Sequence, residues 1–209
     1  AAQGVMAALA AGAQHVFGTS ELRGMRVAVQ GTGKVGGEIC RRLVDAGAVV
    51  VMGDMAPGRR DRLAAVLKTR VVAAEKLAAE DVDIFVPCAL GGTLDGRTVE
   101  ALRAKLVCGA ANNQLESDEA AAALLARGIA YVPDYLANAG GVMSVAGEYL
   151  GESADQVAAR VAAISKNSTG VRPSSRTISS FKPSTFCAST HCAALRSTVS
   201  RWPWAAQSA

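Results

Sequence analysis

The sequence predicts an α/β fold with a doubly wound, mostly parallel sheet and flanking helices. Six short runs rich in β-branched residues recur along the chain, helical stretches separate them, and a cluster of glycines follows the first run. Strands that alternate with helices form right-handed β-α-β units, and the strands of such units lie parallel in one sheet.

The elements follow one another in a regular order. Apolar residues at helical spacing from Val5 to Val16 predict a leading helix over residues 5–17, and Gly18 ends it. The later apolar runs lack strict alternation, which is typical of strands buried on both faces. The expected strands are residues 26–30, 49–54, 70–73, 83–88, 106–110 and 129–133. The helices expected between them are residues 35–46, 59–68, 97–103 and 117–127.

A longer helical region is expected over residues 141–164, after the segment "NAGG". Gly151 interrupts it, and Ser153 followed three residues later by Gln156 predicts a capping box that restarts the helix. The alanine-rich start of the chain lacks the pattern of a signal peptide, and no apolar run approaches the roughly 18 residues that span a bilayer. We therefore expect a soluble cytoplasmic protein and, because the helical pattern already runs at Ala1, a fragment of a longer one.

Cysteine and charge patterns narrow the function classes. The five cysteines are odd in number and include no C-x-x-C pair, so neither a disulfide framework nor a metal site is expected. Residues 165–209 carry six of the 22 Lys and Arg and none of the 18 Asp and Glu, so residues 1–164 carry a net charge of −2. Six charges over that length are sparse for a nucleic-acid-binding arm. We expect this tail to be disordered or translated out of frame.

The domain layout follows from these patterns. Residues 1–24 form a leading helix and connection, residues 25–164 form the α/β domain, and residues 165–209 form the tail.

The segment "VAVQGTGKVGGEI", residues 27–39, has the features of a Rossmann-type phosphate cradle. Gly31 permits a tight turn, Gly33 lets backbone N–H groups approach a pyrophosphate, and Gly36 lets helix and strand pack closely. The first amides of the following helix then face the anion. The expected pyrophosphate-binding residues are Gly31, Thr32, Gly33, Lys34, Val35 and Gly36.

Asp54 identifies the expected cofactor. It ends the second strand 23 residues after Gly31, where a carboxylate hydrogen-bonds the adenosine ribose of NAD. The same carboxylate repels the 2′-phosphate of NADP, whereas Arg59 and Arg60 can offset that repulsion. The sequence therefore favours NAD and leaves use of both dinucleotides open.

Three more stretches follow predicted strands, at the edge where such sheets bind ligands: residues 87–92, 109–115 and 133–142. Asparagine side chains both donate and accept hydrogen bonds, as a nicotinamide carboxamide requires. Asn112, Asn113 and Asn138 are the candidates, although a single asparagine is more often a turn residue.

Four stretches together resemble the leucine/phenylalanine/valine branch of the amino-acid dehydrogenase family. They are "LRGMRVAVQGTGKVGG", "DIFVPCALGG", "GAANNQL" and "YVPDYLANAGGV", and the similarity runs from about residue 4 to 163. The resemblance implies NAD-dependent oxidative deamination of an L-amino acid to a 2-oxo acid and ammonia. It also implies that Cys88, Ala89 and Leu90 lie along the nicotinamide ribose and that Asn112 or Asn113 lies near the carboxamide.

The resemblance further implies what this chain lacks. In the family the catalytic lysines and an aspartate lie on a separate N-terminal domain, so we expect no catalytic residue here and nucleotide binding without turnover. Members are commonly homo-oligomers. Lys34 is a departure, since asparagine is frequent at its position. Asn138, Val142 and Val145 correspond to substrate-binding positions. Two valines favour leucine, valine or isoleucine as the substrate, although the same valines are equally consistent with plain core packing.

Other functions stay open. The chain could be a phenylalanine or glutamate dehydrogenase of the same family, or a nucleotide-binding module without catalysis. An acyl- or phosphate-handling α/β protein is disfavoured, because neither G-x-S-x-G nor G-x-x-x-x-G-K-[ST] occurs. His15, in the leading helix, and His191, in the tail, are not expected to be general bases.

Overall fold

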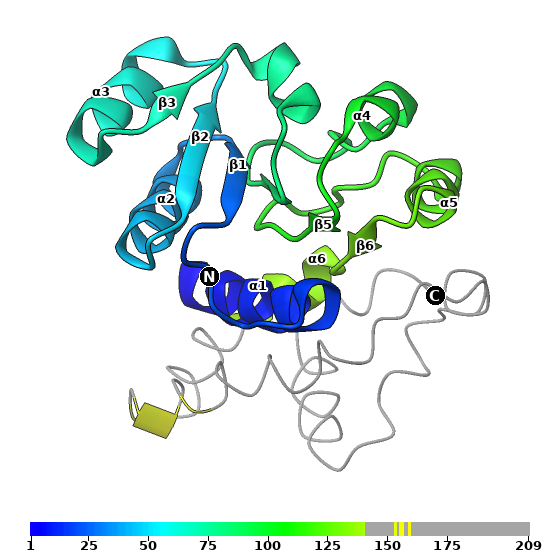
Figure 1. Ribbon diagram of the computed structural model, residues 1–209, viewed down its shortest axis with the longest axis horizontal. Helices are drawn as coiled ribbons and strands as arrows, with labels where there is room; N and C mark the ends of the chain where they lie inside the picture. The colour runs from blue at the N-terminus through cyan, green and yellow to red at the C-terminus, as the bar shows by residue number, and fades with distance from the viewer. Residues whose placement is uncertain (141–152, 154, 157–158, 160–209) are drawn as a thin grey trace, which may run out of the picture. The chain divides into compact units, whose positions relative to one another are not determined.

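The computed structural model describes residues 1–140, 153, 155–156 and 159. The chain divides into the units Ala1–Arg172 and Pro173–Ala209, and all described residues belong to the first. Six parallel strands form one sheet in the order β3-β2-β1-β4-β5-β6 (Figure 1). The strands are β1 (Arg26–Gln30), β2 (Val49–Gly53), β3 (Arg70–Val71), β4 (Ile84–Pro87), β5 (Leu106–Val107) and β6 (Ala130–Tyr131). The predicted doubly wound α/β fold is confirmed, and every strand pair in the described part is parallel.

Strand β1 lies at the centre of the sheet, where the winding reverses. It pairs with β2 on one side, with Arg26 opposite Val49, and with β4 on the other, with Val27 opposite Ile84. The chain runs outward from β1 to β3 and then returns to continue from β4 in the other direction. The carboxyl ends of β1 and β4 therefore form a topological switch point, which is where open α/β sheets bind ligands.

Helices precede, connect and follow the strands. They are α1 (Ala2–Phe17), α2 (Lys34–Asp45), α3 (Pro57–Leu67), α4 (Gly96–Ala101), α5 (Asp118–Ala126) and α6 (Asp134–Ala137), with the 3₁₀ helix η1 (Ala74–Ala79) before β4. All five helices predicted between residues 5 and 127 are present, with ends shifted by a few residues. Helix α6 and η1 were not predicted, because four and six residues are too few to establish a helical period.

Both faces of the sheet are buried. Val27 and Val29 of β1 pack in a core cluster with α1 and α2, whereas Ala28, between them, packs in a second cluster with residues of η1, α4 and α5. Phe85 of β4 is fully buried in the second cluster. Burial on both sides explains why the strands lack polar and apolar alternation.

Local signals set several helix ends. Gly18 ends α1 in the left-handed region with φ 77°. Asp95 caps α4 by accepting a hydrogen bond of 2.7 Å from the Thr98 N–H. The predicted capping box is confirmed, since the Ser153 N–H donates to Gln156 Oε1 at 2.8 Å and the Gln156 N–H donates to Ser153 Oγ at 3.3 Å. Most of the predicted helix over 141–164, including Val142 and Val145, lies outside the described residues.

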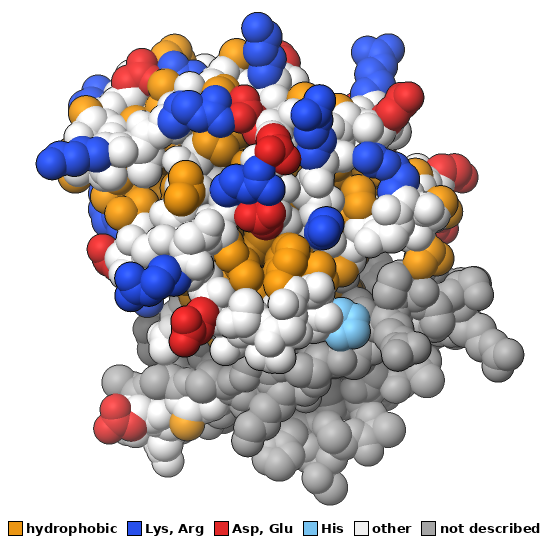
Figure 2. All heavy atoms as spheres, viewed as in Figure 1, with side chains coloured by type: hydrophobic (Ala, Val, Ile, Leu, Met, Phe, Trp, Pro, Cys, Tyr) orange, Lys and Arg blue, Asp and Glu red, His pale blue; other side chains and the backbone are white. Residues whose placement is uncertain are grey.

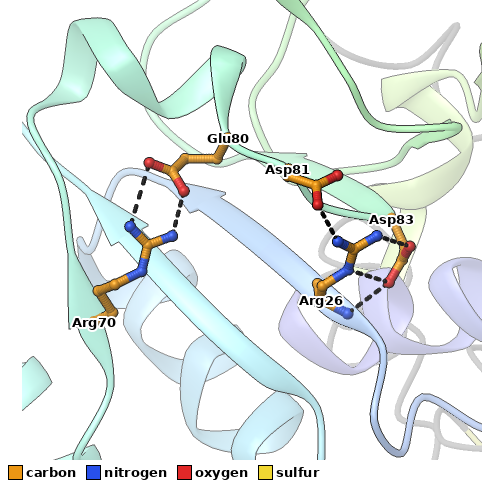
Figure 3. A network of polar contacts seen from close by, with 5 residues as sticks. All are labelled: Arg26, Arg70, Glu80, Asp81 and Asp83. Carbon is orange, nitrogen blue, oxygen red and sulfur yellow. Dashed lines mark hydrogen bonds and ion pairs between the residues drawn. The ribbon is translucent and has the colours of Figure 1, made fainter.

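An ion-pair network joins strands at the amino edge of the sheet (Figure 3). The Arg26 guanidinium contacts Asp81 and donates to Asp83 Oδ1 at 2.9 Å, and the Arg26 backbone N–H donates to Asp83 Oδ2 at 2.8 Å. Arg70 pairs with Glu80 beside it. The side-chain hydrogen bond from Arg26 holds the pKa of Asp83 below its ordinary value, against partial burial that raises it. These bonds tie the start of β1 to the start of β4.

Basic and acidic side chains are interspersed over the upper part of the face in view (Figure 2). Among the described residues, no helix combines the length and the apolar composition needed to cross a bilayer.

The replacement Asp83→Asn removes the carboxylate that binds Arg26. It is expected to lower the free energy of unfolding more at neutral pH than at acid pH. Because the folded-state pKa of Asp83 is depressed, its contribution is present above the unfolded pKa of about 4 and is lost as pH falls through the folded pKa. The variant should have a lower urea midpoint at pH 7, and the difference from the parent should shrink toward pH 2. Circular dichroism measures both midpoints. The control Asp45→Asn, at an exposed carboxylate that ends α2, should shift the midpoint less. A difference that stays constant with pH would contradict the prediction.

Candidate functional site

The glycine loop lies at the carboxyl end of β1, at the switch point. Gly31 has φ 91°, and its N–H donates to the carbonyl of Gly53 at 2.7 Å. A Cβ at Gly31 would lie 2.9 Å from backbone atoms of Cys88 and Ala89. Both the positive φ and the close approach require glycine, which is the tight turn that the sequence predicts.

The other two glycines have opposite surroundings. A Cβ at Gly36, in the first turn of α2, would lie 2.0 Å from the Gly31 carbonyl oxygen and 3.0 Å from the Cβ of Cys88. At Gly33, the N-cap of α2, a Cβ would meet no atom within 4 Å. Gly36 therefore permits close packing and Gly33 leaves open space in front of the helix. With no side chain at the N-cap, the first N–H groups of α2 have no side-chain acceptor.

Asp54 joins the end of β2 to the glycine loop. Its Oδ2 accepts hydrogen bonds from the Thr32 N–H at 2.6 Å and the Thr32 hydroxyl at 2.8 Å, and its Oδ1 accepts from the Ala56 N–H at 2.7 Å. Burial would raise the pKa of Asp54, but the bonds from Thr32 and Ala56 and the nearby charge of Arg59 lower it overall. The carboxylate is therefore ionised and fixes the loop. Sequence reasoning placed Asp54 at this edge but did not predict its bonds to buried Thr32.

An open cleft of about 950 Å³ borders the loop between α2 and α3. Thr32 and Gly33 form its loop end, and Leu63 and Val66 contribute an apolar side. Its charged lining residues are four cations and one acid, namely Lys34, Arg41, Arg59, Arg62 and Glu38. Lys34, the departure within the loop, thus stands exposed at the edge of a basic cleft.

The segment after β4 lies against the glycine loop. The Cys88 N–H donates to the carbonyl of Gln30 at 2.7 Å, and the backbone of Ala89 faces Gly31. The side chain of Leu90, one residue further, is 82% exposed. Residues 88–90 and the loop therefore meet at the same edge, although their contact with a nicotinamide ribose remains a prediction.

The asparagines form a second cluster at this edge. Asn138 Nδ2 donates to Asn112 Oδ1 at 2.8 Å, which brings together two predicted site residues that are 26 positions apart. Asn113 has φ 51°, and its N–H donates to the carboxylate of Asp134. The predicted substrate residues Val142 and Val145 lie outside the described part, so Asn138 alone of that set is located.

Two residues that support this cluster were missed by sequence reasoning. Gln114 is fully buried, and its Nε2 donates to the carbonyls of Gly109 at 3.0 Å and Ala111 at 2.9 Å, which folds the loop that carries Asn112. Asp134 holds Asn113 from the first turn of α6. Asp134, an acid in the first turn of α6, is the local helix-start signal that could have indicated this helix. Nothing local indicates that Gln114 turns inward.

The described thiols are protonated and the described residues hold no metal cluster. Burial raises the pKa of Cys40 and of Cys88 to about 12 and raises that of Cys108 further. In the part of the chain that the structure describes, no group of three His, Cys, Asp or Glu residues is placed to bind a metal ion.

Comparisons with known proteins find relatives that align with most of this chain. Residues 58–171 match the family model of Glutamate/Leucine/Phenylalanine/Valine dehydrogenase. Leucine dehydrogenase of Bacillus subtilis (strain 168) is 39% identical over 166 residues, which cover 79% of this chain and 46% of the relative. Valine dehydrogenase of Streptomyces virginiae is 41% identical over 168 residues, with coverages of 77% and 46%. The chain thus spans about half the length of these relatives.

Two solved structures are similar in fold. The crystal structure of L-tryptophan dehydrogenase from Nostoc punctiforme superimposes with a TM-score of 0.78 and 36% identity, covering 80% of this chain and 51% of that one. A hetero-hexameric glutamate dehydrogenase from Thermus thermophilus, in its Leu-bound form, superimposes with a TM-score of 0.63 and 28% identity, covering 80% of this chain and 45% of that one.

Substitution by alanine should change the free energy of unfolding more at Gly36 than at Gly33, because the surroundings of the two glycines differ. Gly36→Ala is expected to lower the free energy of unfolding by about 1–3 kcal/mol, because the new methyl overlaps backbone that cannot easily move. Gly33→Ala should cost less than about 1 kcal/mol, because alanine is only a weaker N-cap than glycine. Urea denaturation followed by circular dichroism measures both values. Equal losses would show that the loop does not pack as described.

The described cysteines should resist alkylation in the folded protein. Thiolate is the reactive form, and a pKa of about 12 leaves Cys40 and Cys88 almost wholly protonated at pH 8. Peptide mass spectrometry after iodoacetamide treatment should find Cys40, Cys88 and Cys108 unmodified, and modified once urea is added. Rapid labelling of Cys88 without urea would contradict the assignment.

Proposed function

Because this chain belongs to the glutamate/leucine/phenylalanine/valine dehydrogenase family, we propose that its switch-point edge binds NAD for the oxidative deamination of an aliphatic L-amino acid. NAD would accept the hydride that leaves the substrate α-carbon, and water would supply the carbonyl oxygen, so that the products are a 2-oxo acid, ammonia, NADH and a proton. The observation that carries the proposal is the glycine loop, with open space before the uncapped amides of α2 and Asp54 at the tip of the neighbouring strand.

The pyrophosphate is the best-supported part of the cofactor. It binds at the start of α2, where free N–H groups and the helix dipole favour negative charge. The open space beside Gly33 admits it to the backbone, while Gly31 and Gly36 hold the loop in shape. Thr32, Lys34 and Val35 complete the pyrophosphate-binding segment, with exposed Lys34 adding positive charge.

The adenosine ribose binds at Asp54. A carboxylate offers about four lone-pair positions, and three of those on Asp54 already accept bonds from Thr32 and Ala56. The remaining position accepts one ribose hydroxyl. Because its other bonds fix its orientation, Asp54 meets the sugar without losing side-chain freedom on binding.

The nicotinamide end lies across residues 88–90 and the asparagine cluster. Asn112 Oδ1 accepts from Asn138, so the amide NH₂ of Asn112 and the carbonyl oxygen of Asn138 remain for a carboxamide or for the substrate. Asn113 follows on the same loop. Exposed Leu90 offers an apolar surface for the ring.

The substrate is proposed to be leucine or valine. The relatives named leucine and valine dehydrogenase support an aliphatic amino acid, as do Val142 and Val145, which are proposed to line its side chain. The relative named L-tryptophan dehydrogenase keeps an aromatic substrate, such as phenylalanine, as the alternative.

Catalysis is proposed to need more than these residues. The matched relatives are about twice as long as the aligned segment, and no proton-transferring residue is assigned among Gly31–Gly36, Asp54 and the asparagines. The chain as given is therefore proposed to bind dinucleotide without turnover.

The protein is proposed to work in the cytoplasm. It is also proposed to be a homo-oligomer; the hetero-hexameric glutamate dehydrogenase is a more distant relative that also assembles from several subunits.

NADH titration of the 209-residue chain tests the proposal. Bound nicotinamide should show enhanced fluorescence that saturates at micromolar to millimolar NADH, and adding leucine with NAD should give no rise in NADH absorbance. Gly33→Ala should weaken NADH binding by about tenfold, because its methyl enters the space in front of the α2 amides and removes about one charge-assisted hydrogen bond.

The matched control for this titration is Gly96→Ala. A Cβ at Gly96 also meets no atom within 4 Å at a helix start, but that helix is α4. NADH affinity of this variant should equal that of the parent chain. No NADH binding by a chain that circular dichroism shows to be folded would overturn the proposed function.

A further inference from the structure

We propose that Gly91 is a positioning residue for the nicotinamide end of the dinucleotide, because it lets the loops after β4 and β5 pack together as one unit. The inference rests on the proposed function, which puts the nicotinamide across both loops. Residues 88–90 belong to the first loop, and Asn112 and Asn113 belong to the second. Gly91 has no side chain to offer a ligand, so its effect on binding passes through the asparagines.

The backbone around Gly91 leaves no room for a side chain. A Cβ at Gly91 would lie 2.7 Å from the carbonyl oxygen of Asn112 and 3.1 Å from that of Asn113. Because the obstructing atoms belong to the backbone of a packed loop, one of the two loops would have to move. The φ of Gly91 lies outside the left-handed region that favours glycine. The distance between the loops, and not the backbone conformation, therefore requires glycine here.

Backbone hydrogen bonds join the two loops along the same contact. They run from the N–H groups of Gly92, Leu94 and Glu116 to the carbonyls of Asn113, Gln114 and Leu94, at 2.7, 2.9 and 3.2 Å respectively. Leu94 and Leu115 also form a parallel bridge. The loops thus pair in parallel, as do the strands β4 and β5 that lead into them. Residues on the two loops are held at a fixed separation by this ladder.

The second loop is anchored at its start as well. A Cβ at Gly109 would overlap the carbonyl oxygen of Pro87, and the Ala111 N–H donates to that carbonyl at 3.0 Å. Gln114 Nε2 binds the carbonyls of Gly109 and Ala111 from inside the loop. Because residues 109–111 are fixed, a methyl at Gly91 displaces the carbonyls that it meets. Those carbonyls belong to the asparagines that are proposed to face the nicotinamide.

The adenosine and pyrophosphate positions depend on other contacts. Asp54 accepts from the Thr32 N–H at 2.6 Å, and Gly31 packs against the backbone of residues 88–89. The loop after β5 takes part in neither contact. A change at Gly91 should therefore weaken binding of the nicotinamide half and spare binding of the ADP half.

Paired calorimetric titrations of the 209-residue chain with NADH and ADP-ribose test this inference, because ADP-ribose lacks only the nicotinamide. Gly91→Ala should raise the NADH dissociation constant by about tenfold, which corresponds to roughly one lost hydrogen bond at the carboxamide. The ADP-ribose constant should change by less than about twofold, as expected for a distant site. Bound NADH should also fluoresce less than on the parent chain, because its ring is held less rigidly. A purely structural role of Gly91 would not separate the two ligands.

The matched control is Gly96→Ala, which adds the same methyl where a Cβ meets no atom within 4 Å. Both dissociation constants of this variant should equal those of the parent chain. Circular dichroism establishes that each variant is folded.

Hydrogen exchange on the parent chain tests the same inference without any variant. The amides that join the loops, those of Gly92, Leu94 and Glu116, exchange when the loops separate. NADH at ten times its dissociation constant should slow their exchange by about tenfold, because separation of the loops releases the nicotinamide. ADP-ribose at the corresponding concentration should slow it by less than about twofold.

The outcomes separate the inference from the function beneath it. A loss of affinity from Gly91→Ala that is equal for NADH and ADP-ribose, or no loss for either, would overturn the positioning role and leave the proposed function standing. Slowing of exchange by ADP-ribose as strong as that by NADH would also overturn it. Binding of neither ligand by the folded parent chain would instead reject the proposed function, and the inference with it.

Discussion

Close contact between the glycine loop and the ends of two neighbouring strands is the constraint on which this protein's site depends. The Gly31 N–H reaches the end of β2, and Gly36 packs so near the Gly31 carbonyl and Cys88 that no side chain fits. The loop is thereby pressed against β2 and β4, and the first amides of α2 follow Gly33, whose surroundings are open and which provides no side-chain cap. Asp54 completes the arrangement by bonding Thr32, which removes the loop's freedom to relax.

The two edges of the sheet use polar groups in opposite ways. At the amino edge, charges are matched within the protein, as in the pairing of Arg26 with Asp83 and of Arg70 with Glu80. At the carboxyl edge, the α2 amides lack a side-chain cap and the cations of the adjoining cleft outnumber its acids. Matched charges stabilise the fold, whereas the unmatched donors are the groups to which we assign an anionic ligand. This asymmetry follows from the parallel sheet, which gathers all strand ends of one polarity at one edge.

The asparagine side of the site depends on different support. Strands β5 and β6 are two residues long each, so they fix the following loops less than β1 and β2 fix theirs. Buried Gln114 compensates by binding two carbonyls of the loop that carries Asn112, and Asp134 holds the next residue from α6. The pairing of Asn112 with Asn138 then connects the loops after β5 and β6. Side-chain bonds thus replace the strand ladder where the ladder is short.

The order of the main strands and helices, the tight turn at Gly31, the close packing at Gly36 and the position of Asp54 were determined by the sequence alone, because each depends on neighbours within a few residues or on a period along one element. The tertiary structure decided the partners of those residues. That Asp54 binds Thr32, that Arg60 donates to the Val72 carbonyl, and that Gln114 turns inward all arise from contacts between segments joined only by folding. Helix α6 and η1 likewise are too short to show a period, and form because their surroundings in the folded chain hold them.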